Sequence, residues 1–417
     1  MRLPIKRFIT LAALSAFPIA GLHAQFDFTL DGRQVQVHSF ASQGFAYSNE
    51  NNYMTMNSTS GSFAMTDGGV NISSQITDKL RVGAQLYIRN VGQIGKWHPE
   101  LDWAYADYRF KDWFGIRAGK VKTTLGLHND TQDMDFINTW AILPQSIYPM
   151  DLRASTIAHT GGDIYGDVSL KKMGALSYTV YAGQRPEDPY GGYVMGLAAI
   201  GLNMNSYAGW QEGQDLRWNT PVKGLLVGAS LMNQHITGNG SLNLANAIDP
   251  FLIGMGTPDH SIEREHSNKN DYYQYYVQYM VKGLRLEGEY RREYRNEWIG
   301  YYTPTMQPEF NFLVESDTRS WYGSASYRIS KLLELGTYAS WYFFDWRQDL
   351  SAPTNHERDK AVTARFDLSR YWSLKVEGHF MNGYGRFDSI RGFYEQQNPL
   401  GLKPGTSMLV IRAGWNM

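Results

Sequence analysis

Charged side chains recur at every second position in several stretches of this sequence, and they are the residues best placed to act on ions. Alternate residues of an extended chain point to the same side, so such charges would line one face of a sheet. Charges along a wall of low dielectric attract ions of opposite sign and repel ions of the same sign. The basic positions are Arg81, Arg89, Arg109, Arg117, Arg285, Arg291, Arg365, Lys375 and Arg412. The acidic positions in the same phase are Asp107, Glu287, Glu289, Asp367 and Glu377.

A second group of charges lies in the segment 122–155, where acids outnumber bases. The acids are Asp130, Asp133, Asp135 and Asp151, and the bases are Lys122 and Arg153. If this segment faced the basic positions across water, the two groups would set a transverse electric field that acts on passing solutes. The alternative is that single charges pair with cross-strand neighbours and only hydrate the wall.

Residues for covalent or metal chemistry are sparse and poorly spaced. A serine nucleophile needs a nearby histidine as base, and the closest pair, His235 and Ser241, lacks the compact spacing of barrel phospholipases. The stretch 259–266 contains His, Asp and Glu, the residue types that bind metals, but its alternating acids and bases favour a hydrated loop. We therefore expect no catalytic residue, no metal site and no cofactor.

The chain opens with the pattern of an export signal. Arg2, Lys6 and Arg7 precede a mostly apolar run, and the small residue Ala24 fits a cleavage point. We expect a signal peptide over 1–24 and a single domain over 25–417. The net charge of the whole chain is −1, which does not fit a nucleic-acid binder. The chain has no cysteine, so an exported protein of this size needs a source of stability other than disulfides.

Short polar turns divide the chain with a regular rhythm. They lie at 76–80, 110–113, 171–174, 221–224, 281–283, 329–331 and 368–371. Each turn separates two alternating stretches, and longer polar segments connect one hairpin to the next. With one further strand at each end, the pattern predicts sixteen strands. The expected spans are 33–48, 62–76, 80–89, 102–111, 113–121, 156–169, 174–184, 207–220, 224–236, 270–281, 284–296, 316–329, 333–346, 358–369, 372–386 and 405–417.

The alternation shows which face of this sheet is apolar. In the span 80–89, Leu80, Val82 and Leu86 share one face, while Arg81 and Arg89 share the other. Sixteen strands closed into a barrel enclose too wide a space for side chains to fill, so the apolar face must point outward to lipid and the polar face inward to water. The sequence predicts an all-β fold: a transmembrane antiparallel up-and-down β-barrel. A water-soluble all-β protein could have the same composition, but it would not show short turns alternating regularly with long loops.

The end of the chain has a pattern of its own. The last strand places apolar residues on one face, ending with Trp415 and Met417. It resembles the terminal strand of bacterial outer-membrane proteins, which the barrel-assembly machinery recognises as an assembly signal. The usual last residue in those proteins is Phe. Met417 differs from it but is apolar and in phase.

The third long connection, 122–155, is unusually apolar for an exposed loop. Sixteen strands with a large third loop resemble the porin family, in which this loop folds into the lumen. The stretch 116–120 (Ile-Arg-Ala-Gly-Lys), followed by 125–130 (Leu-Gly-Leu-His-Asn-Asp), resembles the phosphate-selective-porin-like branch. The arginine ladder and lysine cluster of that branch do not map onto this chain, since Lys120 and Lys122 are the only close lysines near the loop.

The resemblance implies a protein of the Gram-negative outer membrane and no enzymatic activity. Small hydrophilic solutes or ions would diffuse passively through a water-filled pore narrowed by the third loop. The expected partners are those solutes, outer-membrane lipid and lipopolysaccharide, the barrel-assembly machinery and, as a homotrimer, further copies of the chain. An anion- or phosphate-selective channel is one alternative. A non-conducting structural or adhesive barrel and an outer-membrane enzyme are others.

Overall fold

The fold was determined as a computed structural model, which describes residues 26–30, 32–185, 188–243, 262–303, 305 and 307–417. The expected signal peptide, 1–24, lies outside the described residues, and so does the middle of the long loop expected over 237–269.

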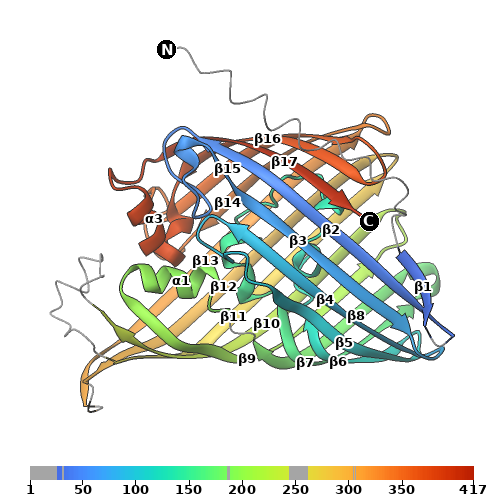
Figure 1. The fold of residues 1–417 in the computed structure, drawn as a ribbon, viewed down its shortest axis with the longest axis horizontal. Coiled ribbons are helices and arrows are strands. Elements are labelled where there is room, and N and C mark those ends of the chain that lie inside the picture. The colour runs from blue at the N-terminus through green and yellow to red at the C-terminus, as the bar shows by residue number, and fades with distance from the viewer. Residues whose placement is uncertain (1–25, 31, 186–187, 244–261, 304, 306) are drawn as a thin grey trace.

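Sixteen antiparallel strands form a closed barrel, as the sequence predicts (Figure 1). Each strand pairs with the next along the chain, and β17 closes the ring on β2. The strands of the ring are β2 (Arg33–Ser48), β3 (Ser62–Gln75), β4 (Leu80–Val91), β5 (Glu100–Lys111), β6 (Phe114–Lys122), β7 (Ala158–Ser169), β8 (Ala175–Arg185), β9 (Leu202–Asn219), β10 (Leu225–Leu242), β11 (Ile262–Val281), β12 (Leu284–Tyr302), β13 (Pro308–Arg328), β14 (Leu333–Phe343), β15 (His356–Asp367), β16 (Trp372–Gly383) and β17 (Gly405–Asn416).

A short extra strand, β1 (Phe26–Leu30), was not predicted. It forms a hairpin with the first residues of β2, pairing Phe26 with Val37 and Leu30 with Arg33. On the same side of β2, β17 pairs only from Phe40 onward. β1 therefore covers the stretch of β2 edge that β17 leaves open.

Buried and exposed side chains alternate along the strands in the predicted sense. On β4, Leu86 is 59% exposed on the outer face, whereas its neighbours Gln85 and Tyr87 are 1% and 3% exposed on the inner face. On β15, Val362 is 53% exposed and Ala361 is 1% exposed. Apolar groups thus cover the outside of the barrel, as expected for strands that face lipid.

Tight turns join the strands at one end of the barrel. β11 and β12 are connected by Lys282 and Gly283 alone, whose φ angles are 46° and 85°. Positive φ at both central residues is the geometry of a two-residue hairpin whose twist matches its strands. The long connections lie at the opposite end.

The long connections carry the helical segments. α1 (Gly192–Ala199) and α3 (Arg391–Gln397) lie together at the end of the barrel opposite β1 (Figure 1). Within the long connections, short 3₁₀ turns occur at Ser58–Ser60, Asn129–Thr131, Asp135–Ile137, Met150–Ser155 and Gly385–Ile390, and a further one, Lys171–Met173, lies in the tight turn between β7 and β8. No helix in the described part of the chain has the length and apolar character to cross a membrane.

The strands from β9 to β13 are longer than predicted. They span 18 to 21 residues each, against 12 for β15, β16 and β17. The expected spans on this side stopped where the apolar alternation stopped. Hairpin pairing continues beyond that point, because backbone hydrogen bonds extend a ladder whatever the polarity of its side chains.

Candidate functional site

The segment 123–157, here called the third loop, folds into the barrel instead of away from it. Its apolar residues pack against the inner wall: Trp140 is 4% exposed and lies in a cluster with Tyr338 of β14. Leu125 is fully buried beside Tyr181 of β8 and Tyr272 of β11. These contacts explain the apolar character of the segment, which would be unfavourable in a loop surrounded by water.

Four of the basic residues predicted for the wall hold this loop by its backbone. Arg365 donates to two loop carbonyls, both at 2.7 Å. Lys375 donates to two more, at 2.6 and 2.9 Å, Arg412 to one at 2.8 Å and Arg291 to one at 2.7 Å. Because a buried carbonyl without a partner is unfavourable, these cations both satisfy the loop and fix its position.

Wall carboxylates bind the loop in the complementary way. Glu377 accepts hydrogen bonds from the backbone N–H groups of Ala141 and Ile142, at 2.9 and 3.1 Å. Glu289 accepts one from Leu127, at 3.0 Å. Charge-assisted hydrogen bonds of this type are stronger than neutral ones, so the loop is anchored along most of its length.

The other predicted basic residues interact with the wall or with other loops in the described part of the chain. Arg81 donates a hydrogen bond to Ser73 at 2.9 Å. The other four form ion pairs: Arg89 with Asp188 at 2.7 Å, Arg109 with Asp167 at 3.2 Å, Arg117 with Asp163 at 3.5 Å and Arg285 with Glu287 at 4.0 Å. Arg109, with a half-exposed side chain, lies beside the tight turn at Asp112.

Asp133 lies at the centre of a buried ion cluster. It binds both Arg153 and Lys122, and the same two cations contact Asp102 of β5 at 2.5 and 2.8 Å. Burial alone would raise the pKa of Asp133, but the charges of Arg153 and Lys122 outweigh burial and hold its pKa well below the usual range. Lys122, expected in the loop, is the last residue of β6.

The remaining acids of the loop differ in how they are paired. Asp135 contacts Lys375 at 2.9 Å and Arg412 at 3.4 Å, and these cations lower the pKa that burial would raise. Asp151 is fully buried and binds Arg386, while Asp130 is only partly buried. Opposite charges that we expected to face each other across water are, at Asp135, in direct contact.

The Asp151–Arg386 pair joins the third loop to the last long loop. Arg386 contacts the two Asp151 oxygens at 2.9 and 3.0 Å, and the Tyr394 hydroxyl donates to Asp151 at 2.6 Å. Tyr53, from the first long loop, lies under the Arg386 guanidinium with 5.4 Å to its ring centre. Three loops thus meet at one buried pair.

A hydrophobic cluster surrounds this pair. It contains Tyr53, Met54 and Met56 from the first loop, Ala141 and Ile142 from the third, and Phe387 and Tyr394 from the last. Met195 of α1, in the fourth loop, packs against it. Inner residues of β2–β4, β16 and β17 complete the cluster, and Glu357 of β15 contacts Arg386 at 3.5 Å. These loops together form a plug over this part of the lumen.

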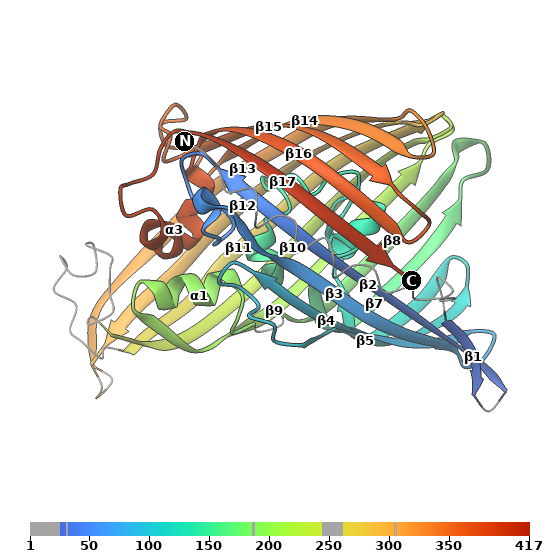
Figure 2. The ribbon, with the colours of Figure 1, turned by 45° about the horizontal axis from the view of Figure 1, so that its top comes forward.

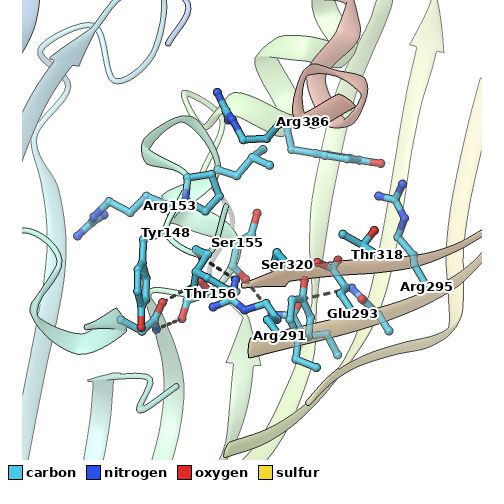
Figure 3. Close-up of a pocket in the computed structure, with 18 of the residues that line it drawn as sticks. Tyr148, Arg153, Ser155, Thr156, Arg291, Glu293, Arg295, Thr318, Ser320 and Arg386 are labelled. Carbon is cyan, nitrogen blue, oxygen red and sulfur yellow. Dashed lines mark hydrogen bonds between the residues drawn. The ribbon is translucent and has the colours of Figure 1, made fainter. Parts of the chain in front are cut away.

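A hollow that is open to solvent, with an empty volume of about 900 Å³, remains between the third loop and the wall formed by β8–β14. Figure 3 shows Tyr148, Ser155 and Thr156 of the loop on one side, and Arg291, Glu293 and Ser320 on the wall. Arg295, Glu297, Thr318 and Arg185 also line the hollow. It is the candidate route through the barrel, because the plug occupies the opposite side.

Arg291 is the distinctive group of this hollow. It is 7% exposed and lies 5.9 Å from the ring centres of both Tyr148 and Tyr272. Its Nε donates to Gln274 at 2.8 Å, whereas its Nη2 has no hydrogen-bond partner among the described residues. A buried guanidinium N–H without a partner is a site where an anion or water would be favourable.

Sequence reasoning missed part of this lining. Glu293, Arg295 and Glu297 continue the inward phase of Arg285 and Arg291 along β12. Following the alternation to the end of the charged run at residue 297 would have found them. Arg185 and Arg386 gave no such signal. Arg185 lies one residue past its expected strand, 174–184, and Arg386, expected at the end of the strand 372–386, lies in the 3₁₀ turn Gly385–Ile390.

The predicted assembly signal lies at the closure of the barrel. Trp415 pairs with Trp372 on β16 and with Ala41 on β2. Met417 exchanges two backbone hydrogen bonds with Ser39, at 2.7 and 2.9 Å. Its recognition by an assembly machinery stays a prediction.

We found no match to a protein-family model and none to a curated protein sequence. The fold is similar to solved structures. OmpF of Salmonella typhi has a TM-score of 0.55 with 11% sequence identity, covering 94% of this chain and 100% of the other. The loop L8 deletion mutant of OmpT from Vibrio cholerae gives 0.54 with 10% identity, over 93% and 100%. An anion-selective porin from Comamonas acidovorans gives 0.52 with 10% identity, over 92% and 100%. At these identities the likeness concerns the fold, and by its fold this chain is similar to bacterial outer-membrane porins.

Proposed function

We propose that this protein is a passive channel of the Gram-negative outer membrane, through which small hydrophilic solutes or ions diffuse. The observation that carries the proposal is the inside-out barrel: apolar side chains cover the outside, and charged side chains line a lumen that is not completely filled. No step requires covalent chemistry, and the similarity to porins by fold supports the same reading.

The proposed route passes through the hollow beside Arg291. Solutes would enter between the tall β9–β13 wall and the plug, and would pass Tyr148 on the loop and Ser320 on the wall. Pore walls that combine polar side chains with low-dielectric surroundings discriminate by size and charge.

Conductance in planar bilayers tests the channel. The refolded protein should produce discrete current steps that scale with salt concentration. A barrel that inserts into the bilayer and stays electrically silent would instead support the structural or adhesive alternative.

A channel that prefers anions is a second candidate function. It is favoured because some of the arginines that line the hollow are not paired with an acid among the residues that the structure describes. Arg153 and Arg386 are bound to acids, but no ion pair is formed by Arg185 or Arg291 with the described residues. The two acids of the hollow, Glu293 and Glu297, lie on the same strand as Arg295. The reversal potential in a salt gradient should therefore have the sign of an anion-preferring pore, and Arg291→Gln should move it toward cations.

Membership of the phosphate-selective-like branch is a finer proposal and rests on the motif at 116–130. Phosphate added in millimolar amounts should then reduce the chloride current, and an unchanged current would count against this branch. A homotrimer is proposed from the porin resemblance, and the mass of the detergent-solubilised protein would test it.

A further inference from the structure

Two cations stand on the outer, lipid-facing surface of the barrel. Arg358 and Lys360 lie two residues apart on β15, so their side chains leave the same face of the strand. Both are exposed, whereas Glu357, Asp359 and Ala361 between and beside them are buried on the inner side. They are the only charged residues at the outward positions of β14–β17, strands that the structure describes completely.

The neighbours of these two cations on the outer face are apolar or neutral. Arg358 lies opposite Trp341 on β14 and Asn382 on β16. Lys360 lies opposite Ala339 and Phe380 on the same two strands, and Phe380 is 58% exposed. Within the described chain, no carboxylate forms an ion pair with either cation. An unpaired charge on a lipid-facing surface is unfavourable unless something from outside the chain neutralises it.

The position of Arg358 and Lys360 along the barrel axis indicates which molecule neutralises them. β15 begins at His356, at the end of the barrel that carries the long loops, so Arg358 and Lys360 lie near that end. A cluster of aromatic residues occupies neighbouring strands at the same level: Trp321 stacks on Trp341 at 5.9 Å and on Phe343 at 5.5 Å. Such rings mark the depth at which acyl chains give way to headgroups. β14 and β15 lie side by side there in Figure 2.

We propose that Arg358 and Lys360 form a binding site for the phosphate of a phosphorylated lipid in the outer leaflet. Arginine offers a planar fork to phosphate oxygens, and lysine adds a mobile point charge. Both side chains are long enough to place the charge at headgroup level while their stems stay among acyl chains. Trp341 and Phe380 flank the cations and provide apolar surface for the acyl chains. The proposal rests on the barrel spanning a bilayer, but not on its conducting ions.

The test compares lipid binding by wild-type protein and by the double variant Arg358→Gln, Lys360→Gln. Both are purified in detergent, exchanged into delipidated micelles and titrated with lipid A in native mass spectrometry. Each basic residue near a membrane surface contributes about 1 kcal/mol toward anionic lipid, so the variant should bind about thirty-fold more weakly. A charge-matched control, Lys223→Gln with Lys331→Gln, changes exposed residues of the tight turns at the other end and should bind as wild type does.

Lipid A lacking its phosphates supplies the second arm. Wild type should bind this lipid as weakly as the double variant binds lipid A, because the site recognises phosphate and not acyl chains. Equal binding of both lipids by wild type, or equal binding of lipid A by wild type and variant, overturns the proposal. A variant that changes the number of chains per micelle and not lipid binding would show that this face contacts a second copy, which also overturns it. Bilayer conductance of the variant should be unchanged, since neither side chain faces the lumen.

Discussion

Asp133 and Arg153 lie 20 residues apart on the third loop and are bound to each other inside the barrel, each nearly excluded from solvent. Arg153 also reaches Asp102 on the wall at 2.5 Å. The pair therefore closes the loop on itself and fixes it to β5. Because these charges neutralise one another and are buried, they do not form an open ring that selects ions. Their main effect is to fix the shape of the lumen.

Removing the central acid should release this part of the loop. Asp133→Asn leaves Arg153 and Lys122 buried with one partner fewer, and breaking a buried pair in this way costs about 3–5 kcal/mol. Denaturant unfolding of the protein in detergent should show the loss. The control Asp167→Asn breaks a half-exposed pair with Arg109 and should cost about 0–1 kcal/mol. Equal losses for the two variants would contradict the assigned role of Asp133.

The same cluster should resist acid. The folded-state pKa of Asp133 is depressed, so its contribution to stability is present above the unfolded carboxyl pKa and is lost only as the pH falls through the depressed value. Any change of conductance as the pH is lowered through the ordinary carboxyl range should then come from other carboxylates, such as those of the hollow, and should persist in Asp133→Asn. A change of conductance within that range that Asp133→Asn abolishes would mean that Asp133 titrates there and is not held ionised.

His128 should give the opposite dependence on pH. Burial lowers the pKa of His128, but the hydrogen bond and charge of Glu287 outweigh burial, so the net shift is upward. A raised folded-state pKa means that the stabilisation is complete below the ordinary histidine pKa and is lost as the pH rises through the raised value. Conductance or current noise should therefore increase above neutral pH. His128→Gln should flatten this profile, and His98→Gln, at an exposed histidine, should leave it intact.

The contact between the third and last loops should limit the size of the lumen. Arg386→Gln removes the guanidinium that binds Asp151 and contacts Tyr53, and Asp151 and Glu357 are left buried without it. The loops should loosen, and single-channel conductance should rise together with cleavage of the loops by added protease. Arg370→Gln, at an exposed tight turn, is the matched control. Wild-type conductance and protease resistance in Arg386→Gln would show that the plug does not depend on this pair.

The barrel could be predicted from sequence because its signals are local. Alternation on β4, such as Gln85 against Leu86, and turns such as Lys282-Gly283 are contained in a few consecutive residues. Each strand of the ring pairs with its neighbour along the chain, so the order of the strands follows from the order of these local patterns. The prediction was wrong for the ends of β9–β13, where pairing continues past the apolar alternation, and it missed α1, although its apolar residues were visible.

The site was less predictable because its contacts are distant and involve the backbone. Arg365 donates to the carbonyl of Asn138, 227 residues away, and no side-chain pattern records a carbonyl acceptor. Opposite charges such as Lys375 and Asp135 were visible as a basic wall and an acidic loop. Whether they touch or face each other across water depends on how deep the loop folds, which composition does not determine.

The absence of cysteine from the chain allows a direct test of the central claim, that ions pass through the hollow beside β13. Ser320→Cys places a thiol in the hollow, and Ser407→Cys places one on an exposed position of β17. A bulky methanethiosulfonate reagent added during a bilayer recording should reduce the current through Ser320→Cys, and dithiothreitol should restore it, while Ser407→Cys stays unaffected. Full current through Ser320→Cys after labelling confirmed by mass spectrometry would contradict the proposed route.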